Sequence, residues 1–479
     1  MIELTLGEVA AIVHGRLAHA DAATPVTGSV EFDSRKVTPG GLFLALPGER
    51  VDGHDYVPGA VEHGAAAGIV THPVPAPSIE VADGFAALAA LAGAVVPRLP
   101  DTTVIGVTGS AGKTSTKDLL AHLLGALGPT VAPPGSYNNE LGHPYTVLRA
   151  TPKTRFLVLE TSARGIGHIA YLTRIAPPRI GVVLNVGSAH LGEFGSREAI
   201  AQAKGELVEA LPSAADGGVA VLNADDPLVA AMAVRTQARV VLVGRAADAQ
   251  VRASDVELDD QGRASFTLDA AGEAVPVTLP LVGEHHVANA LAAAAVALEC
   301  GATPQDIAGL LRTATPASRW RMETTERADG VVVINDAYNA NPESMRAALA
   351  ALARVGAGRA AGGARTWAVL GPMAELGADA PGEHHALGRH VAELGIAQLI
   401  TVGDEARALA DGAAAQDSWD GTATRVPDTA AAVELLRGGL RPGDVVLVKA
   451  SRSASLERVA DAITEDDRSD VQGNGGGAG

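Results

Sequence analysis

The chain has 479 residues, 47% of them hydrophobic, and at roughly 150 residues per domain this length predicts about three globular domains. Its 37 Lys and Arg stand against 55 Asp and Glu, and the net charge of −18 argues against a general nucleic-acid binder while leaving room for a local phosphate pocket. The single cysteine, Cys300, excludes an intramolecular disulfide and a cysteine-built metal site.

The sequence also indicates the cellular compartment of the protein and shows that lysine is rare in it. No uncharged apolar run reaches the 18 or so residues of a membrane span, and the first residues lack a basic and apolar leader, so we expect a cytoplasmic protein with no membrane span. Only six lysines occur, so arginine carries most of the ordinary positive charge. A lysine is therefore a good candidate for a task that only an amine can perform.

Residues 1–98 predict a small N-terminal α/β domain. Segment 6–14 has the apolar spacing of a helix, and segment 41–46 is typical of a short buried strand that ends at a Pro-Gly turn. The pattern breaks at 97–100, where two prolines enclose two other residues, as expected of a linker.

Residues 99–315 alternate predicted strands and helices. The strands cover 103–107, 156–159, 180–184 and 219–222. Because these runs are continuously apolar, they predict a parallel sheet that helices cover on both faces. We also expect a polar β-hairpin within 251–280 and a buried, Ala-rich helix over 287–298.

Residues 316–464 predict a second open α/β sheet of the Rossmann-like kind. Its strands cover 331–334, 366–370, 398–402 and 444–448. The tail at 465–479 is acidic and then Gly-rich, which predicts disorder. The predicted fold class is therefore α/β, with three domains and a disordered tail.

The strongest motif is Thr-Gly-Ser-Ala-Gly-Lys-Thr-Ser at 108–115, between an apolar strand and a helix. Gly109 and Gly112 let the backbone wrap closely around a phosphate, and the helix N-terminus offers free N–H groups. Lys113 is placed to reach the terminal phosphates, and the Thr114 hydroxyl is a ligand for Mg²⁺. The alternative is a Gly-rich turn with an exposed lysine, and the flanking strand and helix argue against it.

Three later residues carry chemistry that suits a bound nucleotide. Glu160 and His190 each follow a predicted strand, and the carboxyl ends of parallel strands face the ligand crevice, so Glu160 suits an Mg²⁺ on nucleotide phosphates. A solvated glutamate and a surface histidine are the alternatives. Lys204 lies among alanines in a helical segment, where a surface lysine paired with Glu206 or Glu209 is the alternative.

In their order along the chain, these residues resemble the Mur ligases. The matching segments after the phosphate loop are Leu-Glu at 159–160, Asn-Val-Gly-x-Ala-His-Leu at 185–191, Ala-Lys-Gly-Glu at 203–206, Gly-x-His-x-x-x-Asn-Ala-Leu-Ala-Ala at 283–293 and Lys-Ala-Ser-Arg at 449–452. The resemblance covers nearly the whole chain, to about residue 462. The sequence departs from the family pattern at Thr161, Ser162, His286 and Pro372.

One branch of the family is especially similar. Segment 335–344, Asn-Asp-Ala-Tyr-Asn-Ala-Asn-Pro-Glu-Ser, resembles the ligases that add D-alanyl-D-alanine to UDP-N-acetylmuramoyl-tripeptide, and segments 33–35, 48–54 and 137–144 are similar to the same branch. The resemblance implies an ATP-dependent ligase that works through an acyl phosphate and makes the UDP-muramoyl-pentapeptide of peptidoglycan synthesis. It implies these two substrates as partners, no nucleic acid, and a monomer.

The family also implies roles for the matching residues. The ATP phosphates would contact Gly109, Ser110, Ala111, Gly112, Lys113, Thr114 and Ser115. Two Mg²⁺ ions would be held by Thr114, Glu160, His190 and a carbamylated Lys204, whose CO₂ adduct supplies oxygen ligands. In addition, Asn289 would contact the adenine, Asp336 the ribose and Arg321 the phosphates. The other substrates would contact Ser34, Arg35, Asn138, Asn139, Tyr338, Asn339 and Asn341. The residues that carry the chemistry would be Lys113, Glu160, His190 and Lys204.

Two other functions stay open on the sequence. The first is another Mur-type amide ligase, which adds the third residue, a diamino acid, or extends folate with glutamate. The second is a P-loop ATPase switch, which hydrolyses ATP without an amine acceptor and has no need of Lys204.

Overall fold

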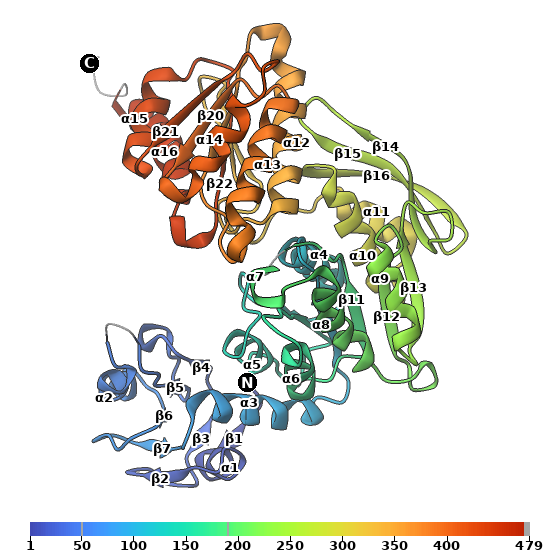
Figure 1. The fold of residues 1–479 in the computed structure, drawn as a ribbon. Coiled ribbons are helices and arrows are strands. Elements are labelled where there is room, and N and C mark those ends of the chain that lie inside the picture. Colours follow the sequence, from blue (N-terminus) through green and yellow to red (C-terminus); the bar gives the residue numbers. More distant parts are fainter. Residues whose placement is uncertain (49–50, 189–190, 474–479) are drawn as a thin grey trace, which may run out of the picture.

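The computed structural model describes residues 1–48, 51–188 and 191–473. They form three α/β regions in chain order, each with its own sheet (Figure 1). The N-terminal region ends with Arg98, the central region extends from Thr103 to Leu311, and the C-terminal region begins at Glu323. The predicted fold class is confirmed. The predicted domain limits at 98 and 315 lie between the sheets and remain predictions.

The N-terminal region holds a five-stranded sheet in the order β2-β7-β6-β5-β4 and a separate pair of strands, β1 and β3. The strands are β1 (Leu4–Thr5), β2 (Arg16–Ala18), β3 (Pro25–Val26), β4 (Val30–Glu31), β5 (Leu42–Leu44), β6 (Ala67–Val70) and β7 (Ser78–Glu80). The helices are α1 (Leu6–Ile12), α2 (Val57–Glu62) and α3 (Gly84–Val95). A capping box between Thr5 and Glu8 starts α1, where the sequence predicted a helix.

The central region holds a nine-stranded sheet in the order β16-β15-β14-β13-β12-β11-β8-β10-β9. Its parallel part consists of β8 (Thr103–Thr108), β9 (Thr130–Val131), β10 (Phe156–Glu160), β11 (Ile180–Val183), β12 (Val219–Asn223) and β13 (Arg239–Gly244). Its helices are α4 (Lys113–Leu127), α5 (Gly142–Val147), α6 (His168–Ile175), α7 (Leu191–Phe194), α8 (Arg197–Glu209), α9 (Pro227–Ala230), α10 (His285–Glu299) and α11 (Pro304–Leu311). The four predicted central strands correspond to β8, β10, β11 and β12, whereas β9 and β13 were missed.

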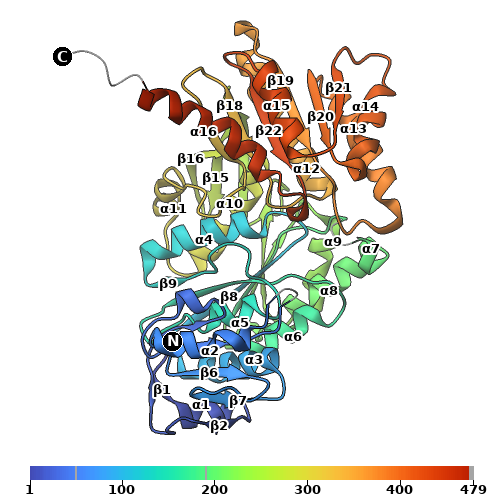
Figure 2. The ribbon, with the colours of Figure 1, turned by 90° about the vertical axis from the view of Figure 1, so that its left-hand side faces the viewer.

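Both faces of this sheet are covered, as the continuous apolar strands predict. On β11, Val182 packs with α4 and α10, while Val183 packs in a separate core with α6 and α8. Successive residues of a strand point to opposite faces, so a strand buried on both faces is apolar at every position. Figure 2 shows α4 and α10 on one side of the sheet and α6 and α8 on the other. This arrangement fixes the start of α4 at the carboxyl end of β8.

The polar stretch predicted as a hairpin is a three-stranded antiparallel extension of the same sheet. It consists of β14 (Val251–Leu258), β15 (Arg263–Ala270) and β16 (Glu273–Val282). It reaches α12 (Pro342–Arg359) of the C-terminal region, where the Arg354 side chain donates hydrogen bonds to the backbone oxygens of Leu258 and Asp259. The extension therefore connects the central sheet to the C-terminal region.

The C-terminal region holds a six-stranded sheet in the order β17-β18-β22-β19-β20-β21, parallel except for the edge strand β17. The strands are β17 (Glu323–Glu326), β18 (Val332–Asn335), β19 (Thr366–Leu370), β20 (Gln398–Val402), β21 (Thr422–Val426) and β22 (Val445–Lys449). The helices besides α12 are α13 (Ala380–Glu393), α14 (Arg407–Ala414), α15 (Thr429–Gly439) and α16 (Glu457–Gly473). The four predicted strands correspond to β18, β19, β20 and β22.

The last helix continues past residue 465, where the sequence predicts that a disordered tail begins. Helix α16 continues to Gly473, well into the acidic segment. Segment 463–472 contains neither glycine nor proline, so once the packed first turns have formed, each further residue adds a hydrogen bond without a new nucleation cost. The remaining residues, 474–479, lie outside the described part of the chain.

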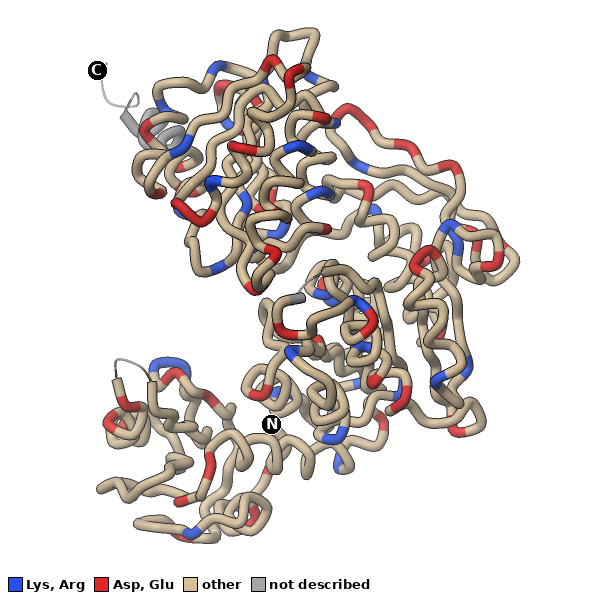
Figure 3. The backbone as a smooth tube through the Cα atoms, viewed as in Figure 1, with Lys and Arg blue, Asp and Glu red and all other residues tan. Residues whose placement is uncertain are grey.

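Charged residues are spread along all three regions (Figure 3), so the net charge of −18 does not come from one acidic segment. Within the described residues, no helix combines the length and the apolar character needed to cross a membrane.

Candidate active site between the central and C-terminal regions

The phosphate loop follows β8 and leads directly into α4. Gly112 has a φ of 81°, which favours glycine, and it stands at the start of the helix without a side-chain cap. The first N–H groups of α4 are thereby left available for an anion. The Lys113 ammonium folds back and donates a hydrogen bond to the Gly109 carbonyl oxygen at 2.6 Å. Burial lowers the pKa of Lys113, and Glu160 opposes that shift.

Two asparagines from other elements brace this loop. The side chain of Asn185, in the loop after β11, accepts a hydrogen bond from the Ala111 N–H at 2.9 Å and donates one to the Ala111 oxygen at 3.1 Å. Asn289, on α10, is buried against Gly112, where its Oδ1 would lie 2.4 Å from a Cβ atom. The Nδ2 of Asn289 has no hydrogen-bond partner among the described residues, so one donor stays available beside the loop.

Glu160 ends β10 and is 1% exposed, so the alternative of a solvated glutamate is wrong. Its two carboxylate oxygens lie 3.2 Å from the Thr114 hydroxyl. Ser136 and Asn138 each donate a hydrogen bond to its Oε1, both at 3.1 Å. A carboxylate among hydroxyl and amide groups is an oxygen-rich set that suits a hard cation such as Mg²⁺.

Lys204 lies on α8 and is 4% exposed, so the alternative of a surface lysine is also wrong. The two glutamates proposed as its partners are engaged elsewhere. Glu206 accepts hydrogen bonds from backbone N–H groups that include Ala170, and Glu209 pairs with Arg235 at 2.8 Å. Burial, with a smaller contribution from the charge of Lys113, lowers the pKa of Lys204 well below its usual value.

The connection between the central and C-terminal regions presents a cation to the phosphate loop. Arg321 donates a hydrogen bond from Nη2 to the Thr114 hydroxyl at 3.1 Å, and its guanidinium lies 4.1 Å from the centre of the Tyr338 ring. The residues on either side of it, Trp320 and Met322, have positive φ angles of 59° and 50°. This strained connection between the regions points Arg321 at the start of α4.

A buried ion pair supports the same side of the site. The Lys449 ammonium, at the end of β22, lies 2.6 Å from Oδ2 of Asp336, which follows β18. It also donates a hydrogen bond to the Asn339 oxygen at 2.8 Å. Oδ1 of Asp336 accepts the N–H of Met322 at 3.1 Å. The pair therefore ties the loop at 336–341 to the segment that carries Arg321.

The start of α12 also contacts the phosphate loop. Asn341 caps this helix and donates a hydrogen bond from Nδ2 to the Ser110 oxygen at 3.2 Å. Glu343, in the first turn, accepts hydrogen bonds from the Ser188 N–H at 2.8 Å and from its hydroxyl at 2.9 Å. Gly187 makes this approach feasible, because a Cβ atom there would lie 2.6 Å from the Glu343 carboxylate carbon.

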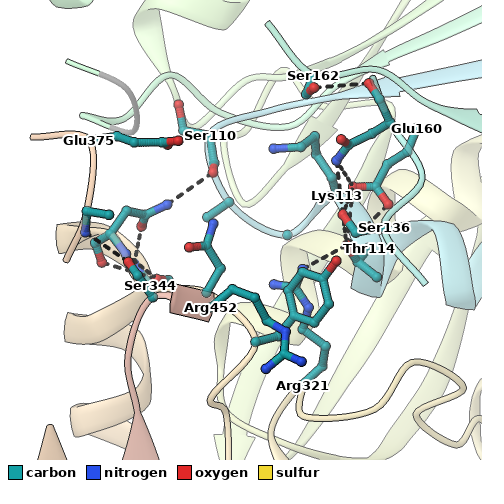
Figure 4. Close-up of a pocket in the computed structure, with 18 of the residues that line it drawn as sticks. Ser110, Lys113, Thr114, Ser136, Glu160, Ser162, Arg321, Ser344, Glu375 and Arg452 are labelled. Atoms are coloured by element: carbon teal, nitrogen blue, oxygen red, sulfur yellow. Dashed lines mark hydrogen bonds between the residues drawn. The ribbon is translucent and has the colours of Figure 1, made fainter. Parts of the chain in front are cut away.

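These groups enclose a cavity of 370 Å³ (Figure 4). We call its two sides the central wall and the C-terminal wall. The central wall consists of Ser110, Ala111, Gly112, Lys113, Thr114, Ser115, Ser136, Asn138, Glu160, Ser162 and Arg164. The C-terminal wall consists of Arg321, Tyr338, Asn339, Asn341, Ser344, Ala374, Glu375, Ser451, Arg452 and Ser453.

Some of the predicted residues lie away from this cavity. Ser34 and Arg35 belong to the N-terminal region, where Arg35 pairs with Asp33 at 2.8 Å and, through that hydrogen bond, lowers the pKa of Asp33 to about 2. The neighbouring Phe32 packs 6.2 Å from the ring of Tyr137, so segment 33–35 lies near the loop that leads to Asn138.

Asn139 does not line the cavity either, because its side-chain oxygen accepts the Gly142 N–H at 2.9 Å and so braces the start of α5. His190 lies outside the described residues, so its predicted role remains a prediction.

The sequence did not assign a role to several lining residues. Ser136 and Glu375 belong to no motif, and Ser344 and Arg452 were noticed only as part of matching segments, as was Lys449, which does not line the cavity. The scarcity of lysine was a usable signal for Lys449, which is buried to 2% exposure.

Comparison with known families matches three family models in succession. "Mur ligase family, catalytic domain" matches residues 27–105, "Mur ligase middle domain" matches 107–297, and "Mur ligase, glutamate ligase domain" matches 320–452. The chain is also 53% identical to the UDP-N-acetylmuramoyl-tripeptide–D-alanyl-D-alanine ligase of Mycobacterium tuberculosis, over 98% of this chain and 99% of that protein. The ligase of the same name from Escherichia coli is 36% identical, over 97% and 99%.

Solved structures give the same result. A crystal structure of MurF from Acinetobacter baumannii superposes with a TM-score of 0.84 at 32% identity, covering 97% of this chain and 99% of that one. The MurF ligase from Thermotoga maritima, solved in complex with ADP, superposes with a TM-score of 0.77 at 29% identity, covering 93% and 99%.

Proposed function

This chain belongs to the Mur ligase family, and we propose that it is the member that joins D-alanyl-D-alanine to UDP-N-acetylmuramoyl-tripeptide, with ATP converted to ADP and phosphate. The product is the UDP-muramoyl-pentapeptide of peptidoglycan synthesis. The observation that carries this proposal is the 370 Å³ cavity, in which a phosphate loop on the central wall faces cations and amides on the C-terminal wall. A ligase that couples two substrates to ATP needs such a shared chamber.

The reaction has two steps. The terminal carboxylate of the tripeptide attacks the γ-phosphorus of ATP, so that an acyl phosphate forms and ADP leaves. The free amine of the dipeptide then attacks the acyl carbon, loses a proton and expels phosphate, which carries away one carboxylate oxygen. Carboxylate and γ-phosphate are both anions, so the site must neutralise charge and exclude water from the acyl phosphate.

The described residues provide the contacts that ATP needs. Residues 109–115 bind the phosphates through backbone N–H groups and the Lys113 ammonium, which leaves the Gly109 oxygen when a phosphate arrives. Arg321 adds a second cation from the C-terminal wall. We assign the adenine contact to Asn289, whose amide donor lacks a partner, and the ribose contact to Asp336.

The donor set fits magnesium. The hydroxyl of Thr114 and the buried carboxylate of Glu160 would hold one Mg²⁺, and Glu160, His190 and a carbamylated Lys204 would hold a second. When bound, the metal ions neutralise the charge of the phosphates and of the transferred group. Around them, Ser136 and Asn138 orient Glu160 through their hydrogen bonds.

Carbamylation of Lys204 is supported by its surroundings. Only a neutral amine adds to CO₂, and burial lowers the pKa of Lys204 and so favours that neutral form. The adduct replaces a buried amine by an anionic oxygen ligand beside Lys113. Burying an unpaired lysine ammonium costs free energy of folding, so a buried lysine at this place calls for a chemical role.

The remaining contacts follow the three regions. Ser34 and Arg35 would bind the UDP-sugar end of the tripeptide substrate, and Asn138 and Asn139 would guide the peptide toward the cavity. Tyr338, Asn339 and Asn341 would face the dipeptide from the C-terminal wall; Asn341 and Asn138 line the cavity. We propose that the enzyme acts as a cytoplasmic monomer, because one chain supplies both walls.

The experiment that tests this function is a panel of amines scored by ADP release in the presence of ATP, Mg²⁺ and UDP-N-acetylmuramoyl-tripeptide. We expect D-alanyl-D-alanine to give the fastest release. Release with a diamino acid or glutamate and none with D-alanyl-D-alanine rejects the assignment in favour of another amide ligase. An ATPase rate that is indifferent to both the UDP-sugar peptide and the dipeptide favours a P-loop switch.

A further inference from the structure

We propose that Arg452 binds the C-terminal carboxylate of the incoming dipeptide and so selects a substrate with a free acid. The inference rests on the proposed function, because that function introduces a small zwitterion whose amine must reach the acyl phosphate while its acid must be placed elsewhere. A carboxylate removed from water needs a cation with matching hydrogen-bond donors, and a guanidinium offers two parallel ones.

Arg452 stands where an open α/β sheet binds ligands. It lies in the loop that follows β22, and Glu375 lies in the loop that follows the neighbouring strand β19. The two loops are joined, since the N–H of Ala374 donates to the Ser451 hydroxyl at 2.9 Å and the N–H of Ser451 donates to the Pro372 oxygen at 2.9 Å. Adjacent strand ends therefore present one continuous surface to the cavity.

The guanidinium of Arg452 is held in place before any substrate arrives. It lies 4.5 Å from the centre of the Trp320 ring, and its Nη1 lies 2.7 Å from Oε1 of Glu457. Glu457 is buried, whereas the Arg452 side chain is 49% exposed. An arginine fixed on one side and open on the other loses little conformational freedom when it binds an anion.

The backbone around Arg452 is strained in a way that fits a binding loop. Ser455, three residues further on, has a φ of 52°, and Glu375 in the neighbouring loop has a φ of 65°. Non-glycine residues adopt such angles only at an energetic cost, and they concentrate at ligand-binding positions. The fold therefore tolerates strain in both loops that form this part of the C-terminal wall.

The other arginines of the cavity have different positions. Arg321 bonds the Thr114 hydroxyl, which places it at the phosphate end (Figure 4). Arg164 lies on the central wall. Arg452 is the lining cation that the C-terminal strand-end loops contribute, and it is thus on the side from which the amine substrate approaches the acyl phosphate in the proposed reaction.

The test compares D-alanyl-D-alanine with D-alanyl-D-alaninamide, which keeps the amine and loses the negative charge of the acid. We would measure kcat/KM for both amines with the wild-type enzyme and with the Arg452→Gln, Arg452→Lys and Arg164→Gln variants. Because Arg452→Gln leaves Glu457 without its cation, the double variant Arg452→Gln/Glu457→Gln is measured as well. Thermal unfolding and calorimetric ADP binding report whether each variant keeps its fold and its nucleotide site.

We expect the wild-type enzyme to prefer the free acid by about 100-fold, and both variants that carry Arg452→Gln to treat the two amines alike within about 3-fold. Arg452→Lys should keep part of the preference, and Arg164→Gln should keep all of it. A merely structural role would lower the rates with both amines and leave their ratio unchanged.

Three results would overturn the inference. The first is an unchanged preference in folded Arg452→Gln enzyme. The second is a defect of that variant confined to the KM for ATP or for the UDP-sugar peptide, which would assign Arg452 to a different anion. The third is a wild-type enzyme that uses both amines equally. A wild-type enzyme that releases no ADP with D-alanyl-D-alanine rejects the proposed function itself, and the inference with it.

Discussion

The two walls of the cavity are held in different ways. The lining residues of the central wall come from three segments, and one of them, at 109–115, presents backbone N–H groups. Its shape depends on Gly112 and on the side chains that brace the loop. On the C-terminal wall, the lining residues come from four separate segments of the chain. There the organising contact is the buried pair between Lys449 and Asp336, which lie 113 positions apart.

The two walls are therefore vulnerable to different substitutions. A wall made of backbone groups is damaged by a change of backbone conformation or by a side chain that fills the loop. A wall held by a buried ion pair is damaged when one charge loses its partner. Substitutions in and behind both walls test that contrast.

The largest effect is expected from the buried lysine behind the central wall. Lys204→Ala should lower kcat by about 1000-fold or more, because the carbamate that holds a metal ion cannot form. The affinity for ADP should stay within about 3-fold of wild type, since Lys204 does not line the cavity. Fixed-time assays of ADP release measure kcat, and calorimetry measures the affinity for ADP. The exposed Lys153 offers the control, and Lys153→Ala should retain wild-type kcat.

The next effect is expected from the ion pair on the C-terminal wall. Lys449→Met leaves the Asp336 charge buried without its partner and should lower the free energy of unfolding by about 3–5 kcal/mol. The double variant Lys449→Met/Asp336→Asn should recover part of that loss. Urea unfolding measures both. The exposed pair of Arg16 and Glu80 is the control, and Arg16→Met should cost about 1 kcal/mol or less. Equal losses from the two pairs would contradict the contrast between the walls.

A smaller effect is expected from the central loop itself. Gly112→Ala places a Cβ atom 2.4 Å from Oδ1 of Asn289, at a φ of 81°. Gly272 has a φ of 80° and open space around it, so Gly272→Ala measures the backbone strain alone, about 1–2 kcal/mol. Gly112→Ala should exceed it by about 1 kcal/mol and should weaken ADP binding by about 10-fold or more. Calorimetric ADP binding that is equally strong in both variants would count against the close packing of the loop.

The smallest effect concerns a neutral buried group behind the central wall. Burial lowers the pKa of His143, on α5, from 6.5 to about 4. Below pH 6.5 His143 binds a proton in the unfolded chain but not in the folded protein. The free energy of unfolding therefore falls as the pH falls from 6.5 toward 4. At pH 5.5 the loss amounts to about 1.2 kcal/mol relative to neutral pH.

His143→Gln removes this titration. The difference between its unfolding free energies at pH 7 and pH 5.5 should be smaller than that of wild type by that same amount. Parallel pH profiles of urea unfolding for the two proteins would show that His143 is protonated in the folded state as well.

What the sequence predicted correctly is what depends on neighbours in the chain. Continuous apolar runs predict β8, β10, β11 and β12, because a strand buried on both faces is apolar at nearly every position and so stands out in the sequence. The phosphate loop is local in the same sense, since its glycines, lysine and helix start lie within eight residues. The edge strands β17 and β21 were missed because they are short, polar and partly exposed.

What the sequence could not predict depends on distant partners. The positive φ angles of Trp320 and Glu375 follow from tertiary packing, and neither residue type favours that conformation. The pairing of Lys449 with Asp336 requires the order of strands in the C-terminal sheet, in which β22 lies between β18 and β19. For the same reason, only the fold shows that Ser136 and Glu375 line the site.

The most direct test of the central claim follows one oxygen atom. UDP-N-acetylmuramoyl-tripeptide labelled with ¹⁸O in its terminal carboxylate is incubated with ATP, Mg²⁺ and D-alanyl-D-alanine, and the released phosphate and the product are analysed by mass spectrometry. With both carboxylate oxygens labelled, attack of the carboxylate on the γ-phosphorus predicts one labelled oxygen in each phosphate and one in the new amide carbonyl of the pentapeptide product. Unlabelled phosphate, or label in AMP, would contradict the acyl phosphate and with it the coupling of the two walls.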